Sequence, residues 1–246
     1  MAAMQATTRL YLDDDHCFES PATVVAVAGT TLACDRTCFY PGGGGQPPDR
    51  GTIRLASGEV LEIASVHADA DDIVWHVSPA AVPADSVGRA ARLSIDRERR
   101  LALARYHTVL HVLNTVALRD YGGWITGVQI NVDISRIDFT LAALSPTVCA
   151  ELEARVNAVL AANHLLRAYT LPEAEFRARE DLRRTLEAMP PVRGGRIRVV
   201  EIEGFDAQAC GGTHVASTAE VGRFAIVRTE NKGRINKRLY VRLTAP

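Results

Sequence analysis

The chain has 246 residues, of which 47% are hydrophobic and 23% charged, and its formal net charge is −1. This composition is ordinary for a globular protein and excludes a collagen-like or intrinsically disordered chain. No uncharged apolar run approaches the roughly 18 residues that a membrane-spanning helix needs, and the first ten residues do not resemble a signal peptide. An odd number of cysteines, five, favours a reducing compartment, so we expect a soluble cytoplasmic protein.

The charge is unevenly distributed along the chain. Residues 1–95 carry a balance of −6 and the remainder a balance of +5. A basic second half suits a polyanionic partner, although two domains with different solvated surfaces would give the same numbers.

The first 95 residues have the pattern of a β domain. Short apolar or alternating runs are separated by turn-forming residues, and the regular spacing of such strands is typical of a small barrel. The runs are residues 23–27, 52–55, 60–66, 73–77 and 90–95. We therefore predict a domain at 1–95 that is a small β-barrel.

Residues 96–246 mix helical and strand patterns. Asp96 is a suitable N-cap for a helix from residue 97 to about 120 that ends at Gly122 and Gly123. A strand region at 127–141 with a break at Ser135-Arg136 follows, and Ser145-Pro146 opens a second helix. A third helix is predicted from Pro172 towards Met189, and strands at 196–202, 223–229 and 237–243 complete the domain. The fold class is α+β, with helices packed on an antiparallel sheet in a second domain at 96–246.

Two separated pairs of residues have the spacing of metal ligands. His107 and His111 lie four residues apart on the predicted helix, so both imidazoles project from one face. Cys210 and His214 flank two glycines, which let the backbone bend so that the thiolate and the imidazole converge. One Cys with three His suits tetrahedral Zn²⁺, although the ligand types alone leave iron or copper open. We predict one zinc ion per chain, with His214 the weakest assignment. Each pair also has a structural alternative: the first could be a half-buried His pair with satisfied hydrogen bonds, and the second a glycine-rich loop with a buried Cys and a chance His.

These motifs resemble those of a known family. The segments HTVLH and CGGTH are similar to the HxxxH and CxxxH signature of the alanyl-tRNA editing domain, found in alanyl-tRNA synthetase and in free-standing AlaX proteins. The segment FYPGGGGQPPDRG at 39–51 independently resembles the glycine-rich segment of the β-barrel that precedes that domain. The resemblance runs from about residue 9 to residue 243. Because no ATP-binding or aminoacylation module is recognisable, it implies the medium-length, free-standing type acting in trans.

The resemblance implies hydrolysis of Ser-tRNA(Ala), and of Gly-tRNA(Ala) as a further candidate, with Ala-tRNA(Ala) spared. Thr126, by its position after the histidine helix, is the candidate for binding the serine hydroxyl, and Gln129 is a second candidate; Thr126 could equally be a strand residue. Asp138 could act as a general base or form a structural salt bridge to Arg136. Since four protein ligands leave no open position, zinc is expected to position and polarise the substrate, with water activation as the alternative.

The candidate contacts to tRNA are glycines and basic residues. The loop of Gly42, Gly43, Gly44 and Gly45 could let RNA approach closely, but it could also be a tight turn or a hinge. Lys232 and Arg234 are basic residues close in sequence to the zinc loop, together with Arg193, Arg196, Arg198, Lys237 and Arg238. Two other functions stay open, a non-catalytic zinc-stabilised module that binds tRNA or a synthetase, and a zinc hydrolase of an unrelated small ester or amide. We expect a monomer, although the sequence does not decide the oligomeric state.

Overall fold

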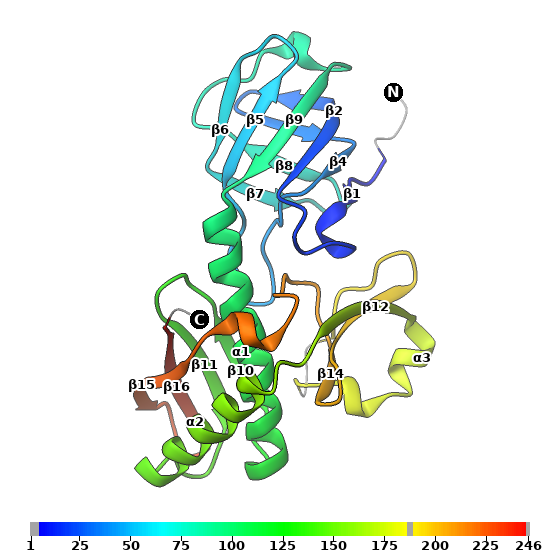
Figure 1. The fold of residues 1–246 in the computed structure, drawn as a ribbon. Helices are drawn as coiled ribbons and strands as arrows, with labels where there is room; N and C mark the ends of the chain where they lie inside the picture. Colours follow the sequence, from blue (N-terminus) through cyan, green and yellow to red (C-terminus); the bar gives the residue numbers. More distant parts are fainter. Residues whose placement is uncertain (1–4, 186–188, 245–246) are drawn as a thin grey trace. The chain divides into compact units, whose positions relative to one another are not determined.

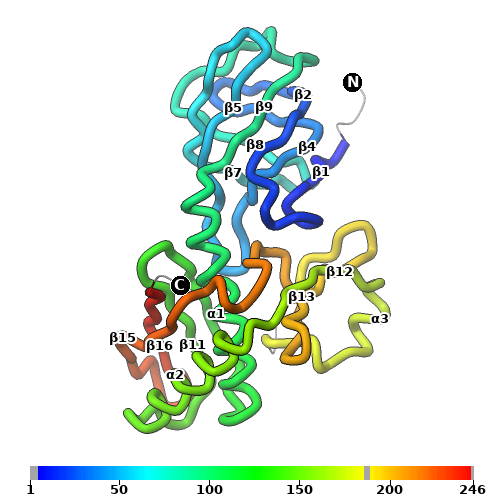
Figure 2. The backbone as a smooth tube through the Cα atoms, in the orientation of Figure 1, coloured from blue at the N-terminus to red at the C-terminus, as the bar shows by residue number. Residues whose placement is uncertain are grey.

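The computed structural model describes residues 5–185 and 189–244. They form two compact units, one made of the chain up to Gly43 with Pro47–Leu101, and the other of Gly44–Gln46 with the chain from Ala102 onwards. The second unit therefore contains a three-residue segment from the glycine-rich loop. In Figure 2 this light-blue segment lies beside helix α1 (Arg97–Tyr121), where Gln46 contacts His107 of the same unit.

The first unit is built on a seven-stranded antiparallel sheet with the order β6-β5-β9-β2-β3-β8-β7 (Figure 1). Alternate residues of these strands are buried, as in β9 with Ala91, Leu93 and Ile95, so one face of the sheet supplies the core. The strands are β2 Glu19–Ala28, β3 Thr31–Cys34, β5 Gly51–Leu55, β6 Val60–Ile63, β7 Ser65–Ala68, β8 Val74–Val77 and β9 Ala90–Ile95. A short parallel pair, β1 Thr8–Arg9 with β4 Arg36–Thr37, lies beside the 3-10 turn Leu10–Leu12, and a second such turn is Ala84–Ser86.

The predicted β character of this region is confirmed, but a closed barrel is not. Among the described residues the pairing ends at β6 and β7, with no ladder joining these two strands. The run predicted at 60–66 is two strands, since β6 pairs with β5 and β7 pairs with β8. Strand β3 was not predicted because it is short and follows a tight turn at Gly29, whose φ is 64°.

His76 is a buried histidine of the first unit that is held neutral. Its Nδ1 donates to the carbonyl of Leu32 at 3.3 Å, and Thr37 Oγ1 donates to its Nε2 at 2.8 Å. Burial lowers the pKa of His76 to about 4. In the uncharged form both ring nitrogens are thus satisfied, and burial disfavours the charged form.

We expect this histidine to make stability fall in acid. The unfolded chain binds a proton near its ordinary pKa of about 6.5, whereas the folded chain binds one only near 4. Stability should therefore fall as the pH drops between these values, by about 3 kcal/mol in total. Urea unfolding at several pH values should show an acid loss smaller by about this amount in His76→Gln than in wild type, whereas His67→Gln, which changes an exposed histidine, should follow wild type. A His76→Gln profile parallel to wild type would contradict the assignment.

The second unit is an α+β arrangement with two antiparallel sheets. The four-stranded sheet has the order β10-β11-β16-β15 and the three-stranded sheet the order β12-β13-β14. Helix α1 contacts both sheets and lies between them in Figure 1. The helices are α1 Arg97–Tyr121, α2 Pro146–Ala161 and α3 Glu173–Arg177, with 3-10 turns Glu180–Leu182 and Thr218–Val221. The strands are β10 Ile125–Gln129, β11 Ser135–Thr140, β12 Leu166–Pro172, β13 Arg196–Ile202, β14 Asp206–Ala209, β15 Phe224–Asn231 and β16 Asn236–Leu243.

Local signals account for the two long helices. Asp96 caps α1 by accepting a hydrogen bond from the amide of Arg99 at 3.0 Å, and the following Gly122 has the left-handed φ of 64°. Ser145 caps α2 by accepting from the amide of Val148 at 3.2 Å. Both helices bury apolar side chains in one core with the four-stranded sheet. Among the described residues, no helix is long and apolar enough to cross a membrane.

Three predictions in this unit were wrong. The third helix begins after Pro172 as predicted, but it is much shorter, because α3 ends at Arg177 after five residues and the 3-10 turn Glu180–Leu182 follows; part of the predicted span, 186–188, lies outside the described residues. The break in the first strand region falls between Gln129 and Ser135, and Ser135 itself begins β11. A single sheet was predicted where the structure has two.

Candidate metal centre

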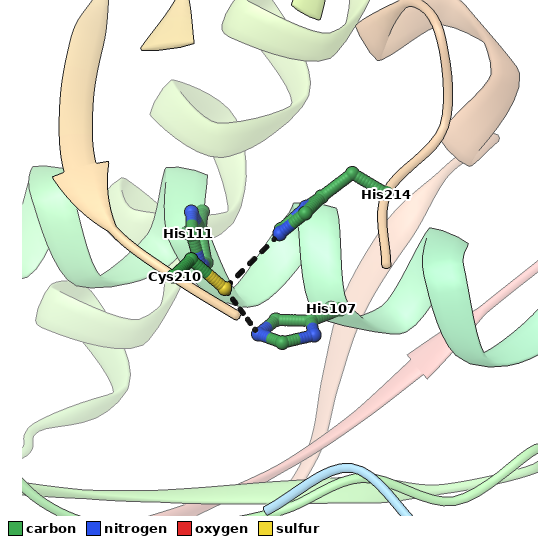
Figure 3. A group of neighbouring side chains, drawn as sticks. All are labelled: His107, His111, Cys210 and His214. Atoms are coloured by element: carbon green, nitrogen blue, oxygen red, sulfur yellow. Dashed lines mark hydrogen bonds between the residues drawn. The ribbon is translucent and has the colours of Figure 1, made fainter. Parts of the chain in front are cut away.

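Helix α1 places two buried imidazoles on one face, one turn apart. His107 and His111 are each 6% exposed, and they face His214 and Cys210 from the loop that follows β14 (Figure 3). One ligand atom from each of these four residues lies within 4.8 Å of the other three. The four residues predicted as metal ligands are therefore brought together from segments about a hundred positions apart.

Arg198 holds the loop that carries Cys210. This arginine of β13 is 8% exposed, and its Nη1 donates to the carbonyls of Cys210 at 3.2 Å and Gly212 at 2.8 Å. Gly212 is needed here because a Cβ at that position would lie 2.2 Å from Cε1 of His107. The hydrogen bonds from Arg198 thus fix the loop, and the absence of a side chain at Gly212 lets it pack against His107 of α1.

The imidazole nitrogens that face away from Cys210 are fixed by hydrogen bonds. Nδ1 of His107 donates to Oε1 of Gln46 at 2.7 Å, and Nδ1 of His214 lies 3.1 Å from the hydroxyl of Thr108. Gln46 is itself held by Thr213, which accepts from its amide nitrogen at 2.8 Å and donates a backbone hydrogen bond to its oxygen at 3.1 Å. Such contacts set the tautomer and the orientation of metal-binding histidines.

The three histidines are held in their neutral form. Burial, reinforced by the charge of Arg198, lowers the pKa of His107 to about 3. Burial and the neighbouring imidazoles hold the pKa values of His111 and His214 well below the usual value. Neutral imidazole is the form that binds a metal ion.

The donor set fits a tetrahedral zinc ion. At ordinary Zn–S and Zn–N bond lengths, a sulfur and a nitrogen ligand are about 3.6 Å apart. Sγ of Cys210 lies 3.4 Å from Nε2 of His107 and 3.3 Å from Nε2 of His214. Nδ1 of His111 is buried and has no hydrogen-bond partner among the described residues, which is unusual for a buried polar atom. One thiolate and three imidazoles are ligands that zinc prefers.

A methyl group at Gly212 should damage this centre. In Gly212→Ala the new Cβ would also lie 2.5 Å from Nδ1 of His107 and 2.9 Å from Oε1 of Gln46, so the ring or the loop must move. We expect zinc affinity to fall by at least about tenfold, as when supporting contacts of a metal ligand are lost. Gly211→Ala is the matched control, because a Cβ at Gly211 meets nothing within 4 Å. Competition with a chelator measures both variants, and equal affinities would contradict this packing argument.

The residues predicted for the substrate pocket lie on the four-stranded sheet. Thr126, at a bulge of β10, donates from Oγ1 to Oδ1 of Asn236 at 2.9 Å, and Gln129 accepts from Nε of Arg136 at 2.8 Å. Among the described contacts, none joins Thr126, Gln129 or Asp138 to the four candidate metal ligands. Their roles in substrate binding stay predictions.

Asp138 forms a salt bridge, but with a different arginine from the one predicted. Both of its carboxylate oxygens accept from the guanidinium of Arg238 at 2.7 Å. The register explains this, because Asp138 of β11 lies directly opposite Arg238 of β16 whereas Arg136 lies opposite Tyr240. A catalytic role for Asp138 stays a prediction.

The glycine-rich loop has a structural role next to the metal centre. Gly42, Gly43, Gly44 and Gly45 all have positive φ, and the carbonyl of Gly45 accepts from the amide of Ile130 at 2.8 Å. A Cβ on Gly45 would lie 2.7 Å from the carbonyl oxygen of Val128, so only glycine fits. This close approach helps to position the next residue, Gln46. Contact of these glycines with tRNA stays a prediction.

The basic candidates for tRNA binding differ in accessibility. Lys232 and Arg234 are exposed at the hairpin between β15 and β16. Lys237 is buried, and its ammonium donates to Asn231 and to the carbonyls of Gly233 and Arg234, so it stabilises that hairpin. Contact of Lys232 and Arg234 with tRNA stays a prediction.

From the sequence, we did not identify Gln46, Thr108 or Arg198 as residues that support the metal centre. Gln46 stands inside the glycine-rich motif and Thr108 follows the first histidine, so both lay in segments already singled out. Nothing local marks Arg198, because its contacts with Cys210 and Gly212 depend on the pairing of β13 with β14.

The fold and the four convergent side chains define this chain as an α+β protein with a candidate zinc centre. Residues 197–240 match the family model described as "Threonyl and Alanyl tRNA synthetase second additional domain". The chain is 35% identical over 242 residues to the alanyl-tRNA editing protein AlaX-M of Methanosarcina mazei, covering 96% of each chain. It is 32% identical to the AlaX-M protein of Saccharolobus solfataricus, covering 95% of this chain and 98% of that one.

A longer protein is also similar. The alanine--tRNA ligase of Thermofilum pendens is 37% identical over 229 residues, which are 91% of this chain and 24% of the ligase. The AlaX-M proteins match this chain over nearly the full length of both partners, and this shows the family. The chain belongs to the alanyl-tRNA editing protein family, whose members are deacylating hydrolases.

Proposed function

We propose that this protein hydrolyses the ester bond of mischarged Ser-tRNA(Ala) in trans, with Gly-tRNA(Ala) as a second candidate substrate, and spares Ala-tRNA(Ala). The convergence of His107, His111, Cys210 and His214 in a chain that matches AlaX-M proteins over nearly its full length carries this proposal. We assign the deacylase centre to residues 96–246 and an accessory β domain to residues 1–95. One zinc ion per chain is held by the four named residues.

The need for a second site follows from the size of the amino acids. A pocket built for alanine cannot strongly reject serine, because one added hydroxyl changes binding by only about 1–3 kcal/mol. A separate hydrolytic site can instead bind the serine hydroxyl. Correctly charged Ala-tRNA(Ala) lacks this hydroxyl and gains no binding energy from that contact. Selective hydrolysis then restores fidelity after charging.

The chain's own residues would orient the reacting groups. Bound zinc would supply positive charge that stabilises the negative charge developing on the ester carbonyl oxygen. Gln46 and Thr108 keep the rings of His107 and His214 in place. Thr126 already donates its hydroxyl hydrogen to Asn236, so its oxygen lone pairs are left to accept a hydrogen bond from the serine hydroxyl.

Thr126→Val should reduce selectivity for serine. Removing one hydrogen bond to the substrate hydroxyl costs about 1–1.5 kcal/mol, or roughly tenfold in kcat/KM for Ser-tRNA(Ala). The control is Thr229→Val, which changes another exposed threonine on the same sheet. Release of serine and of alanine from the two charged tRNAs measures the ratio. Unchanged selectivity in Thr126→Val would remove this residue from the pocket.

The proposed activity itself is tested on the wild-type protein with the same two substrates. Rapid serine release with Ala-tRNA(Ala) intact is the expected result. A folded, zinc-loaded protein that releases serine no faster than buffer would reject hydrolysis and favour the non-catalytic binding module.

A further inference from the structure

The four-stranded sheet of the second unit has one buried and one accessible face. Ile137 and Phe139 of β11 and Leu239 and Val241 of β16 are fully buried in the core with helices α1 and α2. Side chains alternate between the two faces of a strand. The residues between these apolar positions therefore project from the face that the helices do not cover.

One row of residues crosses this outer face on directly paired positions. Gln129 of β10 pairs with Arg136 of β11, Arg136 with Tyr240 of β16, and Tyr240 with Arg228 of β15. The guanidinium of Arg228 lies 3.7 Å from the centre of the Tyr240 ring. Arg136 and Arg228 thus occupy the two positions beside Tyr240 in a line across the whole sheet.

The face is also hollowed and rich in arginine. A groove of about 830 Å³ is lined by Arg136, Arg228, Arg238 and Arg242 together with neutral polar and apolar side chains. Asp138 and Glu230 neutralise Arg238, and Glu230 also pairs with Arg228. Within the described part of the chain, Arg136 and Arg242 have no ion pair. Two arginines are therefore available to an anionic partner, in a unit whose charge balance is basic.

We propose that this arginine face docks the phosphodiester backbone of the substrate tRNA. The proposal rests on the proposed function for the identity of the RNA. Planar guanidinium groups match phosphate oxygens in a bidentate manner, and an arginine stacked on a tyrosine is the kind of flat surface on which RNA bases and riboses lie. Four arginines spread over three adjacent strands can contact several phosphates of a nucleic-acid backbone, whereas a partner with a single acidic side chain would occupy only one of them.

The test is direct binding of uncharged tRNA(Ala), which requires no hydrolysis. The double variant Arg136→Gln/Arg242→Gln removes the two unpaired guanidinium groups. We expect its Kd to rise by at least about tenfold, and the slope of log K against log salt to fall by about 2, because two phosphate contacts are lost. The matched control is Arg155→Gln/Arg167→Gln, which removes the same charge from exposed side chains of α2 and β12. Arg136→Lys/Arg242→Lys should retain most of the salt dependence.

Thermal melting of each variant checks that it folds. Equal affinity and salt slope in the Arg136→Gln/Arg242→Gln variant and its control would overturn the docking face, even if wild type hydrolyses Ser-tRNA(Ala). The docking face would also be overturned if the wild-type protein did not bind tRNA(Ala) at all. A selective loss of binding in a protein that hydrolyses nothing would support the face and reject only the proposed function.

Discussion

Cys210→Ala should lose its zinc and lower the rate of serine release by at least about 100-fold. This effect is larger than that expected for losing a contact that only supports a metal ligand, which is about 10–100-fold. Sγ of Cys210 lies within 3.4 Å of nitrogens on both His107 and His214, and as a zinc-bound thiolate it would be the one anionic ligand among the four. Without the thiolate, three neutral imidazoles must hold a doubly charged ion in a site from which water is largely excluded. We expect the ion to dissociate on dilution and the oriented carbonyl-polarising charge to disappear with it.

Cys149→Ala is the matched control for this variant. Cys149 lies on α2, is also a partly buried free thiol, and is not a member of the four-residue group. Zinc content measured by mass spectrometry and serine release should both resemble wild type in this control. If Cys210→Ala retained one zinc ion and full activity, the assigned ligand set would be wrong.

Asp49→Ala should destabilise the protein by about 3–5 kcal/mol, because it leaves a buried charge without its partner. Arg100 and Asp49 are 0% and 1% exposed, and Nε of Arg100 donates to both carboxylate oxygens at 3.2 and 3.1 Å. The same carboxylate accepts from the backbone amide of Tyr40 at 2.7 Å. The substitution therefore leaves the buried guanidinium without its counter-charge and the amide of Tyr40 without its acceptor inside the first unit.

Urea unfolding compares this variant with Asp85→Ala. The pair of Asp85 with Arg89 is exposed, and its loss should cost less than about 1 kcal/mol. A change below 1 kcal/mol in Asp49→Ala would show that the buried pair is not needed for stability. The expected result would show that Asp49 of the glycine-rich motif stabilises the first unit. Gln46 of the same motif contacts the metal centre through His107.

The elements that could be predicted from sequence are those with local signals. Helix α1 has a cap at Asp96, a continuous apolar face and a glycine stop, and its observed range, Arg97–Tyr121, differs from the prediction by about one residue. The ligand pairs were visible because a helical spacing and a glycine-rich turn each bring two side chains together. That the two pairs meet was predicted from their joint donor set and their place in one domain, and the structure confirms their convergence.

What was missed depends on contacts far apart in the chain. Gln46 reaches His107 across 61 positions, and no local periodicity encodes that distance. The segment after Pro172 is rich in helix-forming residues, yet it buries few apolar side chains, such as Phe176 and Leu182, so a long helix has little packing to stabilise it. Asp138 and Arg238 illustrate the same limit, since their salt bridge follows from the register of two strands about a hundred positions apart.

The most direct test of the central claim is a zinc titration of the metal-free wild-type protein with serine release from Ser-tRNA(Ala) as the readout. We predict that activity is absent without metal, rises in proportion to bound zinc and reaches its maximum at one zinc ion per chain. Full activity in the metal-free protein, or no activity at one bound zinc ion per chain, would contradict the account.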